Sequence, residues 1–239
     1  MILKINMKIV KCLGATKEEV ESGKFDIWVG ISLGNKYFTK ENVKKYILWA
    51  LENTKEDVLV LIGDRLYAIK LEALDKYREQ RALKVASRLG DKIEKDVKEI
   101  ISELPLEKRA LVKTARFSEI IKTKYYNYRL DLLLDYYQKN KEFREFIANI
   151  VKSVYRKGPH TLNEERIDKL AEYVLREIPV YLNGAYASDK EKYYRCTIYP
   201  GLGLIDDLII GIYEKKLFFG LAEKLKIRNQ ICILEGYAD

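Results

Sequence analysis

The chain has 239 residues, 48% of them hydrophobic and 33% charged, which excludes a disordered protein and leaves enough chain to bury a core without disulfides. Lysine and arginine outnumber aspartate and glutamate by 44 to 36, and the resulting charge of +8 favours an anionic partner. One histidine, His160, excludes a histidine-rich metal site, and three cysteines without a CxxC pair support neither a zinc knuckle nor a disulfide framework.

No apolar run reaches the length that a signal peptide or a membrane-spanning helix needs. Residues 202–220 form the most apolar late stretch, but charged residues interrupt it, so we expect it in the core or at an interface. With cysteines that have no evident disulfide partners, these features predict a cytoplasmic protein without a membrane contact.

Two apolar segments near the N-terminus flank an amphipathic one. Residues 25–32 and 57–63 are typical of buried strands, and residues 42–52 carry apolar side chains at helical spacing. Strand, crossover helix and strand form a βαβ unit, which predicts a parallel sheet with helices on its faces.

The other predicted elements follow in chain order. We expect helices over residues 71–104, 125–155 and 163–177, the last stopped by Pro179, and strands at 110–112, 196–199 and 230–234. The segment Arg-Lys-Gly-Pro at 156–159 breaks the chain after the second of these helices. Because no repeat, low-complexity tract or linker occurs, residues 1–239 are predicted to form a single α/β domain.

The basic residues are concentrated in the middle of the chain. Fourteen basic and eight acidic residues lie between Lys76 and Lys124. At about 100° per residue, six cations fall within an arc of about 120°, opposite an apolar face. These six are Arg81, Lys84, Arg88, Lys92, Lys95 and Lys98. Such a stripe can follow nucleic-acid phosphates without reading bases. Asp91 and Glu99 share the arc, so a solvated face with i,i+4 ion pairs is the alternative.

A glycine-flanked serine follows the first strand. The segment Gly-Ile-Ser-Leu-Gly-Asn at residues 30–35 places Ser32 where the carboxyl end of a parallel strand lines a ligand crevice. The segment is neither a G-x-S-x-G elbow nor a G-x-G-x-x-G or Walker loop. Ser32 can therefore face a substrate, although a serine after a strand more often caps the next helix.

Two later clusters supply phenols and a carboxylate. Tyr173 and Glu177 are four residues apart and share a helix face, where they can hold an ammonium group or pass a proton. Tyr199 ends a predicted strand, directly before Pro200. Taken singly, an exposed Tyr–Glu pair and a core tyrosine are the simpler interpretations.

Together these three motifs resemble the cyclodipeptide synthases, which carry a G-[IV]-S-x-x-N-x-x-[FY] turn, a Y-x-x-x-E-x-P helix end and a later strand-end tyrosine. The motifs occur here in the family's order and span most of the chain. The resemblance implies a Rossmann-like domain related to the catalytic domains of class I tyrosyl- and tryptophanyl-tRNA synthetases. It also implies an aminoacyltransferase that uses two aminoacyl-tRNAs, does not bind DNA, and makes a cyclic dipeptide (a 2,5-diketopiperazine).

The resemblance assigns roles to the motif residues. Ser32 would accept the first aminoacyl group as an ester, and Tyr173 and Glu177 would hold its amino group, with Glu177 a proton acceptor. The tethered amine would attack a second aminoacyl-tRNA to give a dipeptidyl enzyme. Internal amine attack would then release the product, with Tyr199 relaying protons.

Two further positions match the family. Asn35 corresponds to its turn asparagine, and Tyr126 to a tyrosine that contacts the aminoacyl amine. One family group has the asparagine with a later Tyr-His, and the other lacks it and has Tyr-Pro. This chain combines Asn35 with Tyr199-Pro200, so its sequence mixes the two signatures.

In relatives, the first aminoacyl pocket is lined by the serine strand, the following helices and the residues after Glu-x-Pro. The corresponding positions are mostly apolar and predict a hydrophobic substrate and a cyclo(Leu-Leu)-like product. They are Trp28, Gly30, Phe117, Ile150, Val180 and Tyr181. Because an aminoacyl ester is already activated, the resemblance implies neither ATP nor a metal, and the lone His160 cannot supply the HIGH motif of synthetases. For the same reason we expect His160→Ala to leave activity intact.

Two other interpretations are left open. A non-catalytic tRNA- or RNA-binding module on a synthetase-like fold would not need Ser32. A generic serine hydrolase would need a histidine base, and the missing elbow argues against it. Oligomeric state is open as well.

Overall fold

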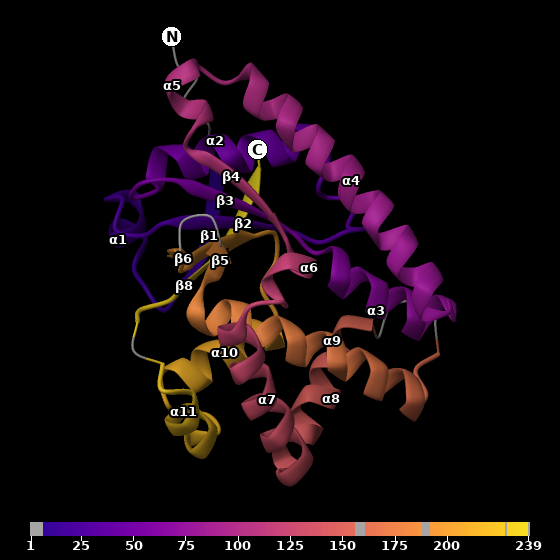
Figure 1. The fold of residues 1–239 in the computed structure, drawn as a ribbon. Coiled ribbons are helices and arrows are strands. Elements are labelled where there is room, and N and C mark those ends of the chain that lie inside the picture. The colour runs from indigo at the N-terminus through magenta and orange to yellow at the C-terminus, as the bar shows by residue number, and fades with distance from the viewer. Residues whose placement is uncertain (1–6, 156–160, 188–191, 228, 239) are drawn as a thin grey trace.

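The computed structural model describes residues 7–155, 161–187, 192–227 and 229–238, so His160 and the predicted break at 156–159 lie outside the described residues. Its centre is a six-stranded sheet with helices on both faces (Figure 1). The strands are β1 (Met7–Leu13), β2 (Ile27–Ile31), β3 (Val58–Ile62), β4 (Val112–Arg116), β7 (Cys196–Tyr199) and β8 (Cys232–Ala238). Their order is β1-β8-β7-β2-β3-β4. β1 pairs antiparallel with β8 and the other neighbours pair in parallel, which confirms the predicted parallel α/β sheet.

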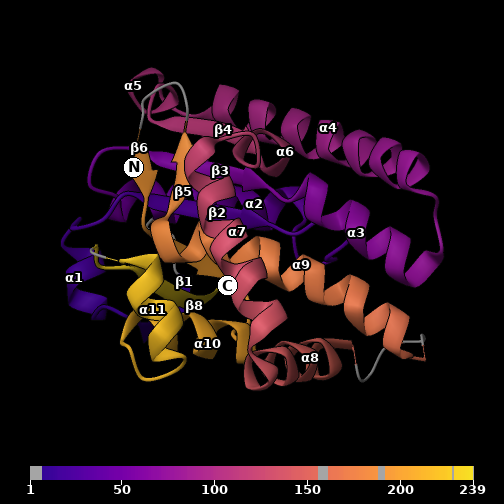
Figure 2. The same cartoon turned by 60° about the horizontal axis from the view of Figure 1, so that its bottom comes forward.

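Two helices cover one face of the sheet and a larger group covers the other. The helices are α1 (Lys17–Glu21), α2 (Lys40–Asn53), α3 (Asp64–Asp75), α4 (Glu79–Glu103), α5 (Leu106–Arg109), α6 (Phe117–Ile120), α7 (Lys124–Lys139), α8 (Lys141–Tyr155), α9 (Glu164–Asn183), α10 (Leu204–Tyr213) and α11 (Phe219–Leu225). α2 and α4 pack on the first face, and Figure 2 shows α7 to α11 gathered on the second. α3 lies between α4 and α9, and a short hairpin of β5 (Ala185–Ala187) and β6 (Lys192–Tyr194) follows α9.

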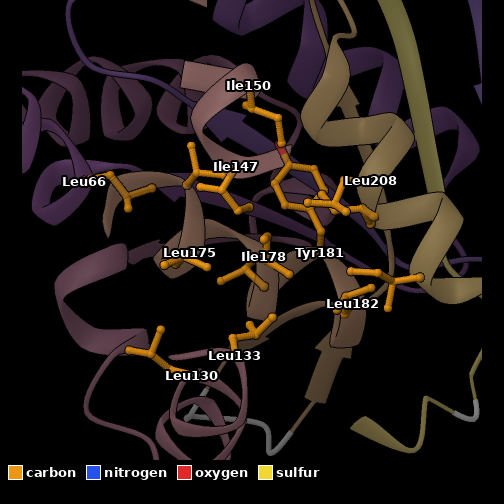
Figure 3. Packing of buried hydrophobic residues seen from close by; sticks show 14 of the residues in the cluster. Leu66, Leu130, Leu133, Ile147, Ile150, Leu175, Ile178, Tyr181, Leu182 and Leu208 are labelled. Atoms are coloured by element: carbon orange, nitrogen blue, oxygen red, sulfur yellow. The ribbon is translucent and has the colours of Figure 1, made fainter. Parts of the chain in front are cut away.

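The central strands are apolar throughout because both of their faces are covered. Leu59 and Leu61 point into the large cluster under α9, whereas Val58 and Val60 pack beneath α2 and α4. The large cluster also takes in residues of α7 to α10 (Figure 3) and of α11. Residues 202–220, predicted for the core or an interface, fold largely into α10, whose Leu208 is fully buried there.

Two predicted helices are each divided in the structure. The expected helix 71–104 is wrong as a single element: α3 ends at Lys76, which adopts the left-handed conformation (φ 54°), and α4 begins three residues later. The expected helix 125–155 divides at Asn140, whose Oδ1 accepts a hydrogen bond from the Phe143 backbone N–H. Lys76 has no local signal for a turn, whereas asparagine is a known helix cap.

Pro179 does not stop α9, contrary to the prediction. The helix continues to Asn183 and ends at Gly184, which has a φ of 89°. Proline removes the backbone donor for the Leu175 carbonyl, and the Tyr126 hydroxyl donates to the neighbouring Arg176 carbonyl over 2.8 Å. Packing of the last turn in the core outweighs the helix-breaking tendency of proline.

Three strands are shifted or missed in the sequence prediction. The third strand is β4 at 112–116 rather than 110–112, and the last strand is β8 at 232–238 rather than 230–234. β1 was not predicted, because its lysines obscured the alternation of a half-exposed edge strand. Among the described residues no helix is both long and apolar enough to span a membrane.

Candidate active site

A pocket of about 500 Å³ opens at the carboxyl ends of β2 and β3, beside the end of β7. β2 is the strand at which the sheet order reverses, because β3 and β4 follow on one side while β7 and β8 lie on the other. This is the point where open α/β sheets bind ligands. The pocket is lined by Trp28, Gly30, Ile31, Ser32, Leu33, Asn35, Leu61, Gly63, Leu66, Tyr67, Lys70, Leu74, Phe117, Val154, Tyr155, Tyr173, Glu177, Val180, Tyr181 and Tyr199.

The turn after β2 is shaped by Gly34. The Asn35 backbone N–H bonds to the Ser32 carbonyl, and Gly34 within this turn has a φ of 77°. A side chain there would be strained, and its Cβ would lie 2.7 Å from the Tyr67 ring. Gly34 therefore lets the turn close and allows α3 to pack against it, which leaves Ser32 facing the pocket.

Asn35, Tyr199 and Ser32 form a chain of hydrogen bonds. The Asn35 side chain donates to the Tyr199 hydroxyl over 3.2 Å, and that hydroxyl donates to Ser32 Oγ over 3.1 Å. The amide is oriented by the Tyr37 backbone N–H, which donates to Asn35 Oδ1 over 3.0 Å. With Oγ accepting from Tyr199, the Ser32 proton is left free to be given away during reaction.

Tyr173 and Glu177 face the same pocket from α9, as their spacing predicts. Both touch the cavity but are surrounded by protein, and burial raises the pKa of Glu177 to about 8, with the charge of Asp206 adding to the effect. Burial also raises the pKa of Tyr173, against a smaller lowering by the Ser32 side chain. The raised pKa favours the protonated form of Glu177 at neutral pH, and an ammonium group bound beside it would favour the ionised form.

Tyr155 is a pocket residue that the sequence analysis missed. It lies at the end of α8, and burial together with the nearby Glu177 raises the pKa of its hydroxyl. Burial likewise raises the pKa of Tyr199. The phenols around Ser32 thus stay neutral and can donate or accept hydrogen bonds without carrying charge. No local pattern marks Tyr155, because it follows an ordinary amphipathic helix.

The floor of the pocket is aromatic and apolar. The Trp28 and Tyr181 rings meet edge to face with 5.2 Å between centroids, and Phe117 and Val180 complete this wall. Gly30 leaves the space above Trp28 open, since a Cβ there would lie 2.9 Å from the indole ring. These five predicted positions therefore meet in one cavity that suits an apolar side chain.

Two predicted substrate-binding residues lie elsewhere. Ile150 is buried in the core with Ile147 (Figure 3), and Val154, one turn later on α8, lines the pocket instead. Tyr126 is buried on the other side of Val180, where its hydroxyl is bound to the Arg176 carbonyl rather than to the cavity. The break at Asn140, which the expected continuous helix 125–155 did not include, sets the register of α8 and so the position of Ile150. Tyr126 is placed by the start of α7 and by its hydrogen bond to Arg176.

The described residues contain no group of three or more histidine, cysteine or acidic side chains arranged to hold a metal ion. The cysteines do meet in the sheet despite their distance in sequence. Cys196 and Cys232 are paired in register on β7 and β8, and Cys12 Sγ lies 3.8 Å from Cys232 Sγ. All three are free thiols.

All six residues of the predicted cationic stripe are exposed on α4, a long helix at the outside of the fold (Figure 1). Lys84, Arg88 and Lys92 form no ion pair with any residue that the structure describes. Lys95 and Lys98 make i,i+4 pairs with acids of α4. The alternative of a salt-bridged face thus holds for the end of the stripe but not for its centre.

The acids on this side of α4 also bind cations outside the stripe. Asp91 and Glu94 both bind Arg116 over 2.6 Å, and Glu99 binds Lys40 over 2.7 Å, while Glu94 and Glu99 also pair with Lys98 and Lys95 of the stripe. These contacts offset negative charge that would otherwise neutralise the stripe.

The sheet, the switch-point pocket and the hydrogen-bonded serine define a Rossmann-like α/β protein with a candidate nucleophile at the switch point. The family model for cyclodipeptide synthase matches residues 10–189. The chain therefore belongs to the cyclodipeptide synthase family, whose members are aminoacyltransferases that form peptide bonds from aminoacyl-tRNAs. No curated protein matches the sequence.

Solved structures share the fold at low sequence identity. A cyclodipeptide synthase from Staphylococcus haemolyticus superposes with a TM-score of 0.73 and 17% identity, covering 98% of this chain and 100% of that chain. A Mycobacterium tuberculosis protein, described as showing that cyclodipeptide synthetases are related to type I tRNA synthetases, gives 0.71 and 16%, covering 98% and 93%. A synthase from Candidatus Glomeribacter gigasporarum bound to Phe-tRNAPhe gives 0.58 and 17%, covering 88% and 86%.

Proposed function

We propose that this protein makes a hydrophobic cyclic dipeptide from two aminoacyl-tRNAs, through an aminoacyl ester on Ser32. The observation that carries the proposal is the chain of hydrogen bonds from Asn35 through Tyr199 to Ser32 Oγ, at the mouth of an apolar pocket. A serine held in this way is aimed at an acyl group whose side chain occupies the pocket.

In the first step, Ser32 Oγ attacks the carbonyl carbon of the aminoacyl ester. The bond between that carbon and the tRNA ribose oxygen breaks, and the ribose oxygen takes up the serine proton. No histidine base is required, since an ester of an alcohol is exchanged for another ester of an alcohol. Tyr199 supports the step by donating a hydrogen bond to Ser32 Oγ. Because Oγ accepts the Tyr199 proton, the hydroxyl proton of Ser32 points away from Tyr199.

Glu177 and Tyr173 are proposed to hold the amino group of the bound residue. An ammonium between them would ionise Glu177, and transfer of its proton to the carboxylate would leave a neutral amine. That amine attacks the carbonyl carbon of a second aminoacyl-tRNA and displaces the tRNA ribose oxygen, giving a dipeptidyl ester. The free amine of the dipeptide then attacks the ester on Ser32, which releases the ring and restores the serine hydroxyl.

The lining of the pocket supports a hydrophobic first residue. Trp28, Phe117, Val180 and Tyr181 offer mostly apolar surface. The bulk of Trp28 on the floor favours an aliphatic side chain of leucine size over tyrosine or tryptophan. A cyclo(Leu-Leu)-like product follows, and mixed products are expected because one methylene contributes only about 1–3 kcal/mol of discrimination.

The centre of the α4 stripe is proposed to bind the tRNA backbone. Lys84, Arg88 and Lys92 are exposed and unneutralised by described residues, as phosphate contacts require. Each ester bond arrives already activated, so we propose that neither ATP nor a metal takes part. Since charged tRNAs are found in the cytoplasm, we place the activity there.

The test is incubation of the purified protein, and of Ser32→Ala beside it, with mixed aminoacyl-tRNAs. Intact mass would report an acyl-enzyme, and mass spectrometry of the small molecules would identify the product. A diketopiperazine made by the parent and absent for Ser32→Ala supports the proposal and names both amino acids. Binding of tRNA without adduct or product would instead support a non-catalytic RNA-binding module.

A further inference from the structure

The side of the pocket formed by α3 carries two polar residues that the acyl chemistry does not use. Tyr67 and Lys70 lie one turn apart on α3, and both line the pocket together with Ser32. Among the described residues that line the pocket, Lys70 is the one cationic side chain and Glu177 is the one carboxylate. Both α3 side chains are half-buried, and Lys70 Nζ lies 5.8 Å from the centroid of the Tyr67 ring.

Tyr67 is held against the turn that carries the nucleophile. Its ring packs on Gly34, where an added Cβ would come within 2.7 Å. Tyr67 also packs against the small cluster that joins α3 to α4 through Ala68 and Ala86. The position of the aromatic ring relative to Ser32 is therefore fixed by packing rather than by a flexible loop.

A continuous set of aromatic and basic side chains leads from this ring to the cationic stripe. Tyr77, in the connection between α3 and α4, packs on the same cluster as Tyr67 and is close enough to influence the pKa of the Tyr67 hydroxyl. The Arg81 guanidinium stacks 4.3 Å above the Tyr77 ring, and Arg81 is the first cation of the stripe. No described ion pair neutralises Lys70 along this path.

We infer that Tyr67 and Lys70 receive the last nucleotide of the tRNA, with the terminal adenine base against the Tyr67 ring and its 5′-phosphate at Lys70. The inference rests on the proposed function, which brings the ester carbonyl to Ser32 Oγ. The base and the phosphate then belong to the nucleotide that carries the ester and must lie beside Ser32. Unpaired nucleotides bind proteins by stacking on aromatic rings and by phosphate contacts with cations, which are the two groups present here.

The experiment measures the affinity for uncharged tRNA. Because the α4 stripe is proposed to bind the tRNA backbone and is unchanged in the variants, the affinity of each variant stays within the measurable range. Three forms of one tRNA are compared: the complete molecule, one with an abasic terminal nucleotide, and one lacking that nucleotide. In the parent, removing the base is expected to weaken binding about tenfold. Removing the remaining sugar and phosphate should weaken it about tenfold further.

The variants separate the two contacts. Tyr67→Leu keeps an apolar side chain on this face of α3 but removes the aromatic ring, and it should abolish the effect of the base, whereas Tyr67→Phe should retain it. Lys70→Met keeps the aliphatic stem and should abolish the effect of the phosphate, and Lys70→Arg should retain it. Tyr128→Leu and Lys141→Met, exposed residues on α7 and α8, are the matched controls.

Three outcomes decide the question. Loss of the base effect in Tyr67→Leu and of the phosphate effect in Lys70→Met, with unchanged controls, establishes the subsite. The subsite is overturned if the losses of affinity on removing the base and the phosphate are equal in parent and variants, or if the parent shows no such loss. Either result leaves the proposed function standing. Absence of both tRNA binding and diketopiperazine in the parent would instead overturn the proposed function itself.

Discussion

The hydroxyl of Tyr199, at the end of β7, donates a hydrogen bond to Ser32 Oγ, at the end of β2, over 3.1 Å. The two residues are far apart in sequence, and the parallel pairing of β2 with β7 brings them together. Tyr199 is in turn held by Asn35 and by contact with the Phe38 ring, 5.5 Å away between centroids. The Ser32 hydroxyl is therefore oriented by two strands and a turn.

Removal of this hydroxyl tests its role. Tyr199→Phe keeps the ring against Phe38 and should leave the melting temperature nearly unchanged. The rate of acyl-Ser32 formation should fall about ten- to a hundredfold, because the serine loses the donor that orients it. Time-resolved intact mass measures the rate, and an unchanged rate would remove Tyr199 from the acylation step. Tyr128→Phe, on an exposed tyrosine of α7, is the control.

The raised pKa of Glu177 predicts how activity depends on pH. A carboxyl with a pKa of about 8 in the free enzyme accepts protons poorly at pH 6 and well at pH 9, so kcat/KM for product formation should rise through this range. Glu177→Gln should abolish both the rise and most of the activity. The measurement is the rate of diketopiperazine formation against pH, with intact aminoacyl-tRNA confirmed at each point. A flat profile in the parent would contradict the assignment.

The same carboxyl affects stability, with a sign opposite to that of an ion-paired acid. Its pKa is higher in the folded state than the ordinary 4.5, so the folded state binds more protons between pH 4.5 and about 8. The free energy of unfolding should therefore decrease as pH rises through this window, at up to about 1.4 kcal/mol per unit. Urea titrations at pH 5 and pH 8 should show a smaller decrease for Glu177→Gln. An equal decrease in the variant would assign the effect to other groups.

Asp206 provides a control on the electrostatics of Glu177. The negative charge of Asp206 raises the pKa of Glu177 further, and burial raises the pKa of Asp206 itself to about 6. Asp206→Asn can still accept from the Gly203 backbone N–H and so keep the start of α10. The pH profile of product formation should move to lower pH in this variant. A profile that stays in place would show that burial alone sets the Glu177 pKa.

The cationic stripe makes a prediction about salt. Replacing Lys84, Arg88 or Lys92 with alanine should weaken tRNA binding for all sequences alike and reduce the slope of log K against log salt by about 0.7–0.9 each. Lys95→Ala and Lys98→Ala should have smaller effects, because both cations already pair with acids of α4. Fluorescence anisotropy over a salt series measures this. Equal slopes for all five variants would argue against a specific role for the centre of the stripe.

The sequence alone identified the parallel sheet, the motif residues and the cationic face, because each depends on local periodicity or on residues close in the chain. The apolar runs of β2 and β3 and the four-residue spacing of Tyr173 and Glu177 are visible without coordinates. Ten of the twelve predicted catalytic and substrate-binding residues line this pocket, and for the apolar ones among them it was the resemblance to the cyclodipeptide synthases, rather than periodicity, that pointed to their positions.

Only the tertiary structure decided the rest. The left-handed residue Lys76 and the cap at Asn140 end helices that periodicity alone would continue, and the resulting register puts Ile150 in the core and Val154 in the pocket. The contributions of Tyr155 and Tyr67 likewise arise from elements packed around the switch point. Helix propensity and hydrophobic pattern specify which face of a helix is buried, but not which other element that face packs against. Long-range packing therefore decides which side chains face the cavity.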